Sequence, residues 1–174
     1  MTDLTSPKHA EISRRLDEEP GAVLEYVAKE MGVSPADVIR CLPADQATSV
    51  AGDLLETVTN NVAEWGEITF IVNTEDVIFE AKGSLPHGSK ARGFFNLHGD
   101  PIGGHLKDEN CGMIAFVSRP LFTTQTKCLQ FFNKSSNCMF KIYLGRDEER
   151  QMHASQVTAF DALRDRLAAG VAKE

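Results

Sequence analysis

The sequence predicts an α+β fold, with helices at both ends of the chain and a large antiparallel sheet between them. Residues 1–45 and the C-terminal segment carry apolar side chains at helical spacing. From Glu67 to Leu144 the apolar residues fall instead in short β-branched and aromatic runs separated by turn residues. Because those connections are too short for helical crossovers, neighbouring strands are expected to run antiparallel. Helices, then strands, then a helix is the order of an α+β domain.

Three short helices are expected in the N-terminal region, each with a proline near its start. The prolines are Pro7, Pro20 and Pro35, and proline suits the first helical position because its missing N–H would have no partner there. Gly32 supplies a C-terminal stop for the second helix, and Ser34 supplies an N-cap for the third.

Two longer apolar stripes predict helices on either side of the strand region. One starts at about Ala51 and comprises Leu55, Val58, Val62 and Trp65. The other lies near the C-terminus and comprises Val157, Phe160, Leu163, Leu167 and Val171.

Seven strands are expected between these two helices. They are Ile68–Val72, Val77–Ala81, Gly93–Leu97, Gly104–Leu106, Met113–Val117, Thr126–Phe132 and Cys138–Leu144. Residues of the last run alternate, with Cys138 and Phe140 on one face and Lys141 on the other, so it is expected to be half buried. Residues 1–174 are expected to form a single domain, with a helical subregion (1–47), a helix and sheet (48–147) and a final helix (148–174).

Charge and hydropathy restrict the class of partner. The chain has 18 basic and 25 acidic side chains, a net charge of −7, whereas nucleic-acid binding normally requires a surplus of Lys and Arg. The longest uninterrupted apolar run, Met113–Val117, is far shorter than the roughly 20 residues of a membrane span. Charged residues also interrupt the start of the chain, unlike a secretory signal. We therefore expect a cytoplasmic protein that neither inserts into membranes nor binds nucleic acid.

Residues 20–42 nevertheless have the outline of a helix-turn-helix, which makes a DNA-binding regulator an alternative. A DNA reader needs basic residues on its second helix to neutralise phosphates. That helix offers only Arg40, and Asp37 lies in its first turn. A helical pair that packs on the rest of the domain explains the same pattern.

The segment from Phe94 to Lys107 is the main candidate for a binding site. It holds His98 and His105 together with Gly99, Gly103 and Gly104, and Gly93 directly precedes it. Glycine weakens a strand and often marks the close approach of a ligand or another backbone. A turn histidine at His98 and a hydrogen-bonded strand histidine at His105 are the structural alternatives. The sequence shows none of the common hydrolase, metalloprotease or nucleotide-binding motifs.

Several blocks of the sequence together resemble a known family, the cytosolic heme-utilisation carriers HutX/ChuX. The blocks are Glu64–Gly66, Thr74–Ile78, Phe95–Leu97, Gly104–Cys111, Phe131–Lys134 and Met139–Asp147. The resemblance implies a cytoplasmic homodimer that binds heme and passes it to a downstream heme-degrading enzyme. It also implies that each chain is one half of the two-repeat sheet platform of the HemS/ChuS proteins. The implied function is a carrier and not an enzyme, with heme degradation as the alternative.

The resemblance assigns the family's heme-associated histidine to His105, as an axial ligand of the heme iron, with His98 as the alternative. The family also uses a histidine where this chain has Asn73 and a tyrosine where it has Phe94. Heme iron is bound by His, Cys, Met or Tyr, so neither Asn73 nor Phe94 replaces the family's ligand. No Cys-x-x-Cys-His motif is present, so the heme is expected to be non-covalent.

Other side chains are expected to contact the porphyrin. The candidates for contact with the apolar macrocycle are Phe94, Phe95 and Met113. The candidates for pairing with the heme propionates are Arg92, Lys107 and Lys90.

Overall fold

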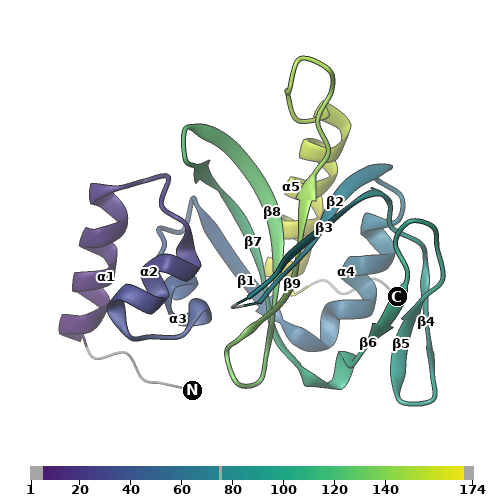
Figure 1. Ribbon diagram of the computed structural model, residues 1–174, viewed down its shortest axis with the longest axis horizontal. Helices are drawn as coiled ribbons and strands as arrows, with labels where there is room; N and C mark the ends of the chain where they lie inside the picture. The colour runs from purple at the N-terminus through teal and green to yellow at the C-terminus, as the bar shows by residue number, and fades with distance from the viewer. Residues whose placement is uncertain (1–5, 75, 171–174) are drawn as a thin grey trace.

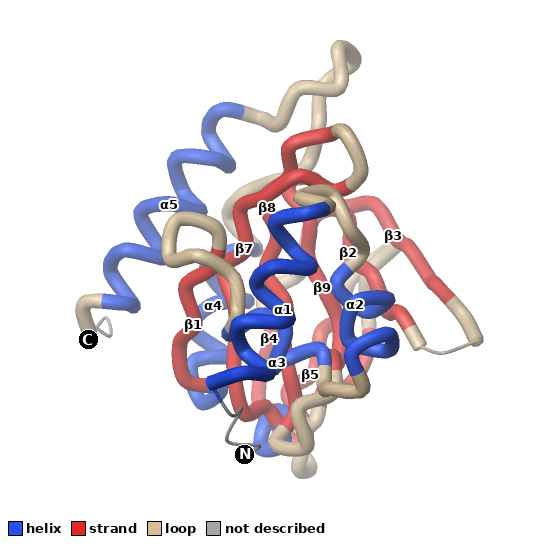
Figure 2. The backbone as a smooth tube through the Cα atoms, turned by 90° about the vertical axis from the view of Figure 1, so that its left-hand side faces the viewer, coloured by secondary structure: helices blue, strands red, loops and turns tan. Residues whose placement is uncertain are grey.

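The computed structural model describes residues 6–74 and 76–170, which form a central six-stranded sheet with different elements on its two faces (Figure 1). Helices α1–α3 gather beside one face, whereas α4, α5 and a small three-stranded sheet lie beyond the other. In the view turned by 90°, α1–α3 lie in front of the strands (Figure 2). The expected order of helices, antiparallel sheet and helix is confirmed.

Three helices fill the N-terminal region: α1 (Ser6–Glu18), α2 (Leu24–Met31) and α3 (Pro35–Arg40). The predicted stop and cap are both present. Gly32 adopts the left-handed conformation with φ 65°, and Ser34 and Asp37 form a reciprocal capping box. Pro20 does not begin α2, because the chain turns through Pro20 and the helix starts at Leu24.

The main sheet has the order β1-β7-β8-β9-β2-β3, and all its neighbouring strands are antiparallel. Its strands are β1 (Ala47–Ala51), β2 (Glu67–Asn73), β3 (Ile78–Ser84), β7 (Cys111–Leu121), β8 (Thr124–Asn133) and β9 (Cys138–Leu144). The predicted strands are confirmed with small changes in their ends. Strand β1 was not predicted, and it adds an edge strand that pairs with β7.

The second sheet has the order β4-β5-β6 and is also antiparallel. Its strands are β4 (Gly88–Ala91), β5 (Phe94–Leu97) and β6 (Gly104–Leu106). Strand β4, with the sequence Gly-Ser-Lys-Ala, was not predicted because it contains no β-branched or aromatic residue. Arg92 and Gly93 connect β4 to β5 with φ values of 55° and 77°, as a tight hairpin turn requires.

Two helices cover the inner face of the main sheet, α4 (Leu55–Val62) and α5 (Ala154–Ala168). A 3₁₀ turn, Gly52–Leu54, precedes α4, and a second one, Asp108–Asn110, precedes β7. The predicted stripes pack into one core with the inward side chains of both sheets, although Trp65 and Val157 are only partly buried. The helix expected from about Ala51 through Trp65 is shorter, because Ala51 belongs to β1 and α4 ends at Val62. Val171 of the predicted C-terminal stripe lies outside the described residues. No helix among residues 6–74 and 76–170 is long and apolar enough to cross a membrane.

Strand β9 is buried on both faces, which corrects the expectation of a half-buried strand. Phe140 packs in the core under α4 and α5, whereas Tyr143 packs toward the N-terminal helices. The β8–β9 ladder has a register shift, in which Phe131 pairs with Phe140 but Phe132 pairs with Cys138. Cys138 therefore packs in a second apolar core, which lies between the main sheet and the N-terminal helices. On the same face Lys141 is only 6% exposed, because α2 covers it.

Two buried cations attach the N-terminal helices to the sheet. Lys141 forms an ion pair with Glu25 in the first turn of α2. Arg119 of β7 is 4% exposed and donates hydrogen bonds to the carbonyl oxygens of Pro20 and Ala22, the latter at 2.8 Å. These contacts fix α2 against the strands.

Candidate functional site

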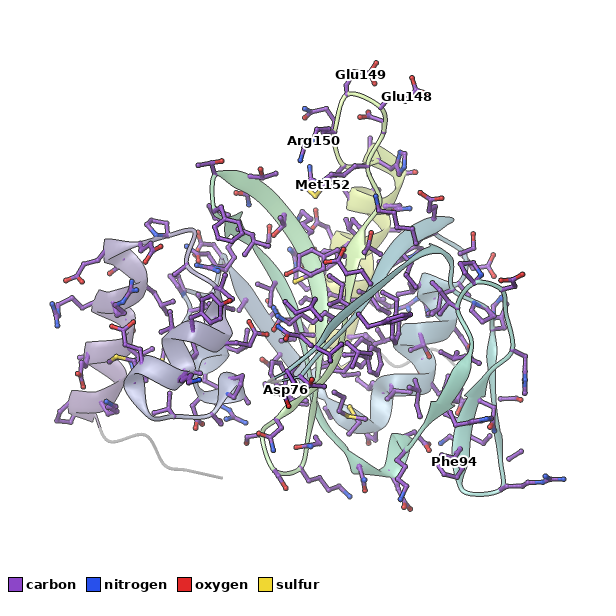
Figure 3. All side chains as sticks on the ribbon, in the orientation of Figure 1. Asp76, Phe94, Glu148, Glu149, Arg150 and Met152 are labelled. Atoms are coloured by element: carbon purple, nitrogen blue, oxygen red, sulfur yellow. The ribbon has the colours of Figure 1, made fainter. Side chains whose placement is uncertain are left out.

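The outward face of the small sheet brings together four of the residues in the glycine-rich segment. His105 of β6 pairs in register with Asn96 of β5. Phe94 lies beside them, with its ring centroid 5.9 Å from that of His105 and the two planes inclined at 62°. The Nζ of Lys107 lies 5.9 Å from the Phe94 centroid. We call Phe94, Asn96, His105 and Lys107 the β5–β6 cluster; Figure 3 labels Phe94 on the small sheet, away from the N-terminal helices.

Within this cluster the His105 imidazole is exposed to solvent but held by a hydrogen bond to Asn96. His105 is an exposed residue, whereas Asn96 is only 7% exposed. The Nδ1 of His105 lies 2.6 Å from the Oδ1 of Asn96. One ring nitrogen is therefore used inside the sheet, and the other is available to an external partner. Asn96 was not among the predicted site residues, although its place opposite His105 follows from pairing the two predicted strands.

The glycines of the segment have separate roles. A Cβ on Gly99 would lie 2.7 Å from the carbonyl oxygen of Ile102, and one on Gly103 would lie 3.0 Å from the carbonyl oxygen of Gly99. Both glycines are therefore needed by the loop that joins β5 to β6. A Cβ on Gly104 would meet nothing within 4 Å. Open space therefore adjoins the backbone directly before His105.

The cationic candidates differ in how strongly they are already held. Lys90 is engaged by Asp108 at 3.0 Å and Glu56 at 3.5 Å, and these contacts raise the pKa of its amine. Arg92 is exposed at the β4–β5 turn and, with Phe94, lines a hollow of about 360 Å³. Arg92 and Lys107 are thus the better placed candidates for an anionic group.

His98 lies just beyond the end of β5 and is exposed. It follows Asn96 by two positions and is therefore near the loop end of the small sheet, whereas His105 lies within the ladder. His98 belongs to the same part of the molecule as the β5–β6 cluster, so it stays the alternative ligand.

Two predicted contacts with the macrocycle are corrected by the structure. Phe95 is 0% exposed and packs inward, because it follows Phe94 and strand residues alternate between faces. Met113 is 9% exposed and lies in the core between the main sheet and the N-terminal helices. Neither side chain reaches the face that presents His105.

Asn73 lies elsewhere, at the end of β2 where it pairs with Ile78. It lines a larger hollow of about 900 Å³ between α2 and the β2–β3 hairpin, which we call the α2–β3 groove. Figure 3 labels Asp76 at this hairpin, on the side of the N-terminal helices. The groove is rimmed by exposed apolar side chains, Tyr26, Val77, Ile78 and Phe122.

The cysteines take structural positions. Burial raises the pKa of the Cys111 thiol to about 11 and that of Cys138 to about 12. Cys41 and Cys128 are also buried, and burial raises their pKa as well. Because the thiolate is the metal-binding form, these four side chains are poor candidates for an iron ligand.

Residues 20–42, which have the outline of a helix-turn-helix, pack against the main sheet. Val38 and Ile39 of its second helix, α3, are no more than 1% exposed, and Arg40 pairs with Asp37 at 2.9 Å. Four of the six residues of α3, Ala36–Ile39, are buried, so this helix has little free surface to present to DNA. This arrangement agrees with the alternative of a helical pair that packs on the domain.

Comparison with known proteins finds relatives that are named for the utilisation, transport or binding of heme. The family model described as "Haem utilisation ChuX/HutX" matches residues 48–163. The intracellular heme transport protein HutX of Vibrio cholerae serotype O1 is 34% identical over 155 residues, which are 88% of this chain and 80% of HutX. The heme-binding protein ChuX is 41% identical with a TM-score of 0.82, over 92% of this chain and 98% of that one.

A more distant likeness concerns the fold alone. ChuS, a heme-degrading enzyme of Escherichia coli O157:H7, is 15% identical with a TM-score of 0.73, and the match covers 86% of this chain but 47% of ChuS. The chain therefore has the fold of about half of ChuS, as the resemblance implied. With the family model matching over most of the sheet and α5, and HutX matching along nearly the whole chain, this protein belongs to the ChuX/HutX haem-utilisation family.

Proposed function

We propose that the protein is a cytoplasmic heme carrier, which binds heme without a covalent bond and passes it to a downstream heme-degrading enzyme. The observation that carries the proposal is the exposed imidazole of His105, flanked by an aromatic ring and a cation, on a chain of the ChuX/HutX family. The names of HutX, a transport protein, and ChuX, a binding protein, support a carrier over an enzyme.

In this proposal His105 is the axial ligand of the iron. Phe94 contacts the macrocycle, and Arg92 and Lys107 pair with the propionates. A carrier has to release its cargo, and a single imidazole on an exposed strand suits that requirement better than an enclosed site with two protein ligands. His98 is the alternative ligand because it lies beyond the end of the same sheet.

Titration of hemin into the wild type, His105→Ala and His98→Ala tests the ligand directly. We expect His105→Ala to shift the Soret maximum and to weaken binding, while His98→Ala behaves as the wild type. His87→Ala is a matched control, since His87 is an exposed histidine engaged by Glu64 at 2.6 Å, outside the β5–β6 cluster. Normal binding by His105→Ala together with loss in His98→Ala would assign the ligand to His98.

The proposed homodimer has a candidate interface on β3. This strand lies at the edge of the main sheet, where within the described residues it pairs only with β2. Ile78 and Phe79 are each 61% exposed, and Val77, just before the strand, is 57% exposed. An apolar edge strand is a template for pairing with another chain. The exposed residues of the α2–β3 groove continue this apolar surface.

The oligomeric state, measured by light scattering coupled to size-exclusion chromatography, tests this interface. We expect a dimer for the wild type and a monomer for Ile78→Asp, because a carboxylate at a paired edge would be buried without a partner. Glu148→Gln, in the loop after β9 and away from β3, removes a charge from an exposed position and should leave the dimer intact. A wild-type monomer, or a dimer that survives Ile78→Asp, would contradict this assignment.

A further inference from the structure

We propose that Asn96 fixes the tautomer of His105, so that the neutral imidazole carries its proton on Nδ1 and presents an unprotonated Nε2 to the heme iron. This inference rests on the proposed role of His105 as the iron ligand. Asn96 acts as a positioning residue, since it works through His105.

The two residues face each other on adjacent strands. Asn96 in β5 and His105 in β6 are register partners, so their side chains lie on the same face of the small sheet. Phe95 and Leu97, on either side of Asn96, are buried beneath the sheet. Asn96 is itself only 7% exposed although it points outward, because the β4–β5 backbone and His105 cover it.

The orientation of the Asn96 amide is determined by its surroundings. Its Nδ2 lies 3.2, 3.1 and 3.0 Å from the backbone carbonyl oxygens of Ser89, Ala91 and Phe94. Carbonyl oxygens can only accept hydrogen bonds, so the group facing them has to be the NH₂. A flipped amide would place an oxygen against all three carbonyl oxygens. The amide oxygen therefore faces His105.

This orientation determines the position of the proton on the imidazole. The Oδ1 of Asn96 lies 2.6 Å from the Nδ1 of His105, and an amide oxygen only accepts. The Nδ1 therefore has to donate. A neutral imidazole has one N–H, which leaves a free lone pair on Nε2. Metal-binding histidines commonly donate their second N–H to a neighbouring oxygen, which fixes both the tautomer and the ring orientation.

The tautomer is measurable in the heme-free protein by ¹⁵N-resolved NMR of the histidine rings at about pH 8.5, where an ordinary histidine is neutral. The spectrum of His105→Gln identifies the His105 signals by their absence. We expect a protonated Nδ1 and an unprotonated Nε2 in the wild type. A protonated Nε2 overturns the proposal without any reference to heme.

Two substitutions at Asn96 form a matched pair. Asn96→Leu and Asn96→Asp both remove the NH₂ that binds the three carbonyl oxygens, but only Asn96→Asp keeps an acceptor for Nδ1–H. The second carboxylate oxygen of Asn96→Asp faces those carbonyl oxygens, so this variant disturbs the hairpin at least as much as Asn96→Leu does. We therefore expect the Nδ1–H form to persist in Asn96→Asp and to give way to a mixture in Asn96→Leu. Asn60→Ala is the control for a loosened hairpin, because Asn60 accepts a hydrogen bond from the Gly88 N–H at 3.0 Å and does not contact His105. A persistent Nδ1–H form in Asn96→Leu overturns the proposal.

Heme affinity provides the second readout. We expect Asn96→Leu to bind hemin about 10-fold more weakly than Asn96→Asp, the lower end of the effect of removing such a partner. Equal affinities of the two variants contradict the positioning role. If His105→Ala binds hemin as the wild type does, the proposed role of His105 as the iron ligand fails, whereas the NMR result tests the Asn96–His105 hydrogen bond on its own.

Discussion

Two adjacent phenylalanines in β5 allow effects on stability to be separated from effects on heme binding. Phe94 is half-buried on the face with His105, while Phe95 is 0% exposed in the core. Truncating a buried phenylalanine to alanine costs about 3–5 kcal/mol, because apolar contact is lost and a cavity remains. Truncating Phe94 should cost at most about 1 kcal/mol of stability. Its expected effect is on heme, since an aromatic contact contributes about 0.5–1.5 kcal/mol, or about 2- to 12-fold in affinity.

Urea unfolding followed by hemin titration measures both effects. With a slope of about 2 kcal/mol per M, Phe95→Ala should lower the unfolding midpoint by about 1.5–2.5 M and leave the hemin affinity of the folded protein nearly unchanged. Phe94→Ala should do the reverse. The assignment of faces would be refuted if Phe94→Ala lost as much stability as Phe95→Ala, or if Phe95→Ala alone weakened hemin binding while still folded.

Two further predictions concern alkaline pH and reactivity toward oxygen. Burial raises the pKa of the Cys138 thiol to about 12 in the folded protein, whereas an unfolded cysteine ionises near pH 8.5. The folded state then holds the proton more tightly, so the contribution of Cys138 to the unfolding free energy should be constant below about pH 8.5 and fall by at most about 5 kcal/mol as pH rises toward 12. Cys138→Ser should make the alkaline decline measured in denaturant titrations less steep, and an unchanged slope would contradict this prediction. For a carrier, the Soret band of the heme-loaded protein should persist when ascorbate and oxygen are added. Steady loss of that band, with release of iron or a linear tetrapyrrole, would instead indicate a heme-degrading enzyme.

The sequence predicted the strands that have a recognisable side-chain pattern. It missed the strands whose conformation depends on pairing with a neighbouring strand. Strands β6 and β9 have the predicted bounds, because apolar alternation or a glycine-flanked motif identifies them. Strand β1, Ala47–Ala51, is half-buried or exposed along its length, and its conformation depends on pairing with β7. Propensity alone does not reveal such pairing.

Faces of strands were harder to predict than the strands themselves. Alternation places Phe95 with Leu97 on the buried side, so the inward position of Phe95 was available from the sequence pattern. Met113 and Lys141 were different cases, because the sequence does not show that helices α1–α3 cover the second face of the main sheet. The register shift at Phe131 and Phe132 is likewise decided by the packing of neighbouring strands.

In the candidate site the glycine pattern selected the segment that holds His98 and His105, and the resemblance selected His105, which the structure places at an exposed position of β6. Neither selected Asn96, because a polar residue between two buried apolar ones looks like ordinary strand alternation. Its significance depends on which residue it pairs with and on the three carbonyl oxygens that hold its amide. Both depend on the three-dimensional hairpin geometry.

The strands that carry the β5–β6 cluster are only three and four residues long, in a sheet separate from the six-stranded one. Short strands with one exposed face have low local opening free energies compared with a buried central sheet. We therefore expect their backbone amides to exchange with deuterium well before those of β7 and β8. Local opening of this small sheet would free whatever is held on it while the six-stranded sheet stays paired, so that delivery becomes a local event and the carrier does not unfold as a whole.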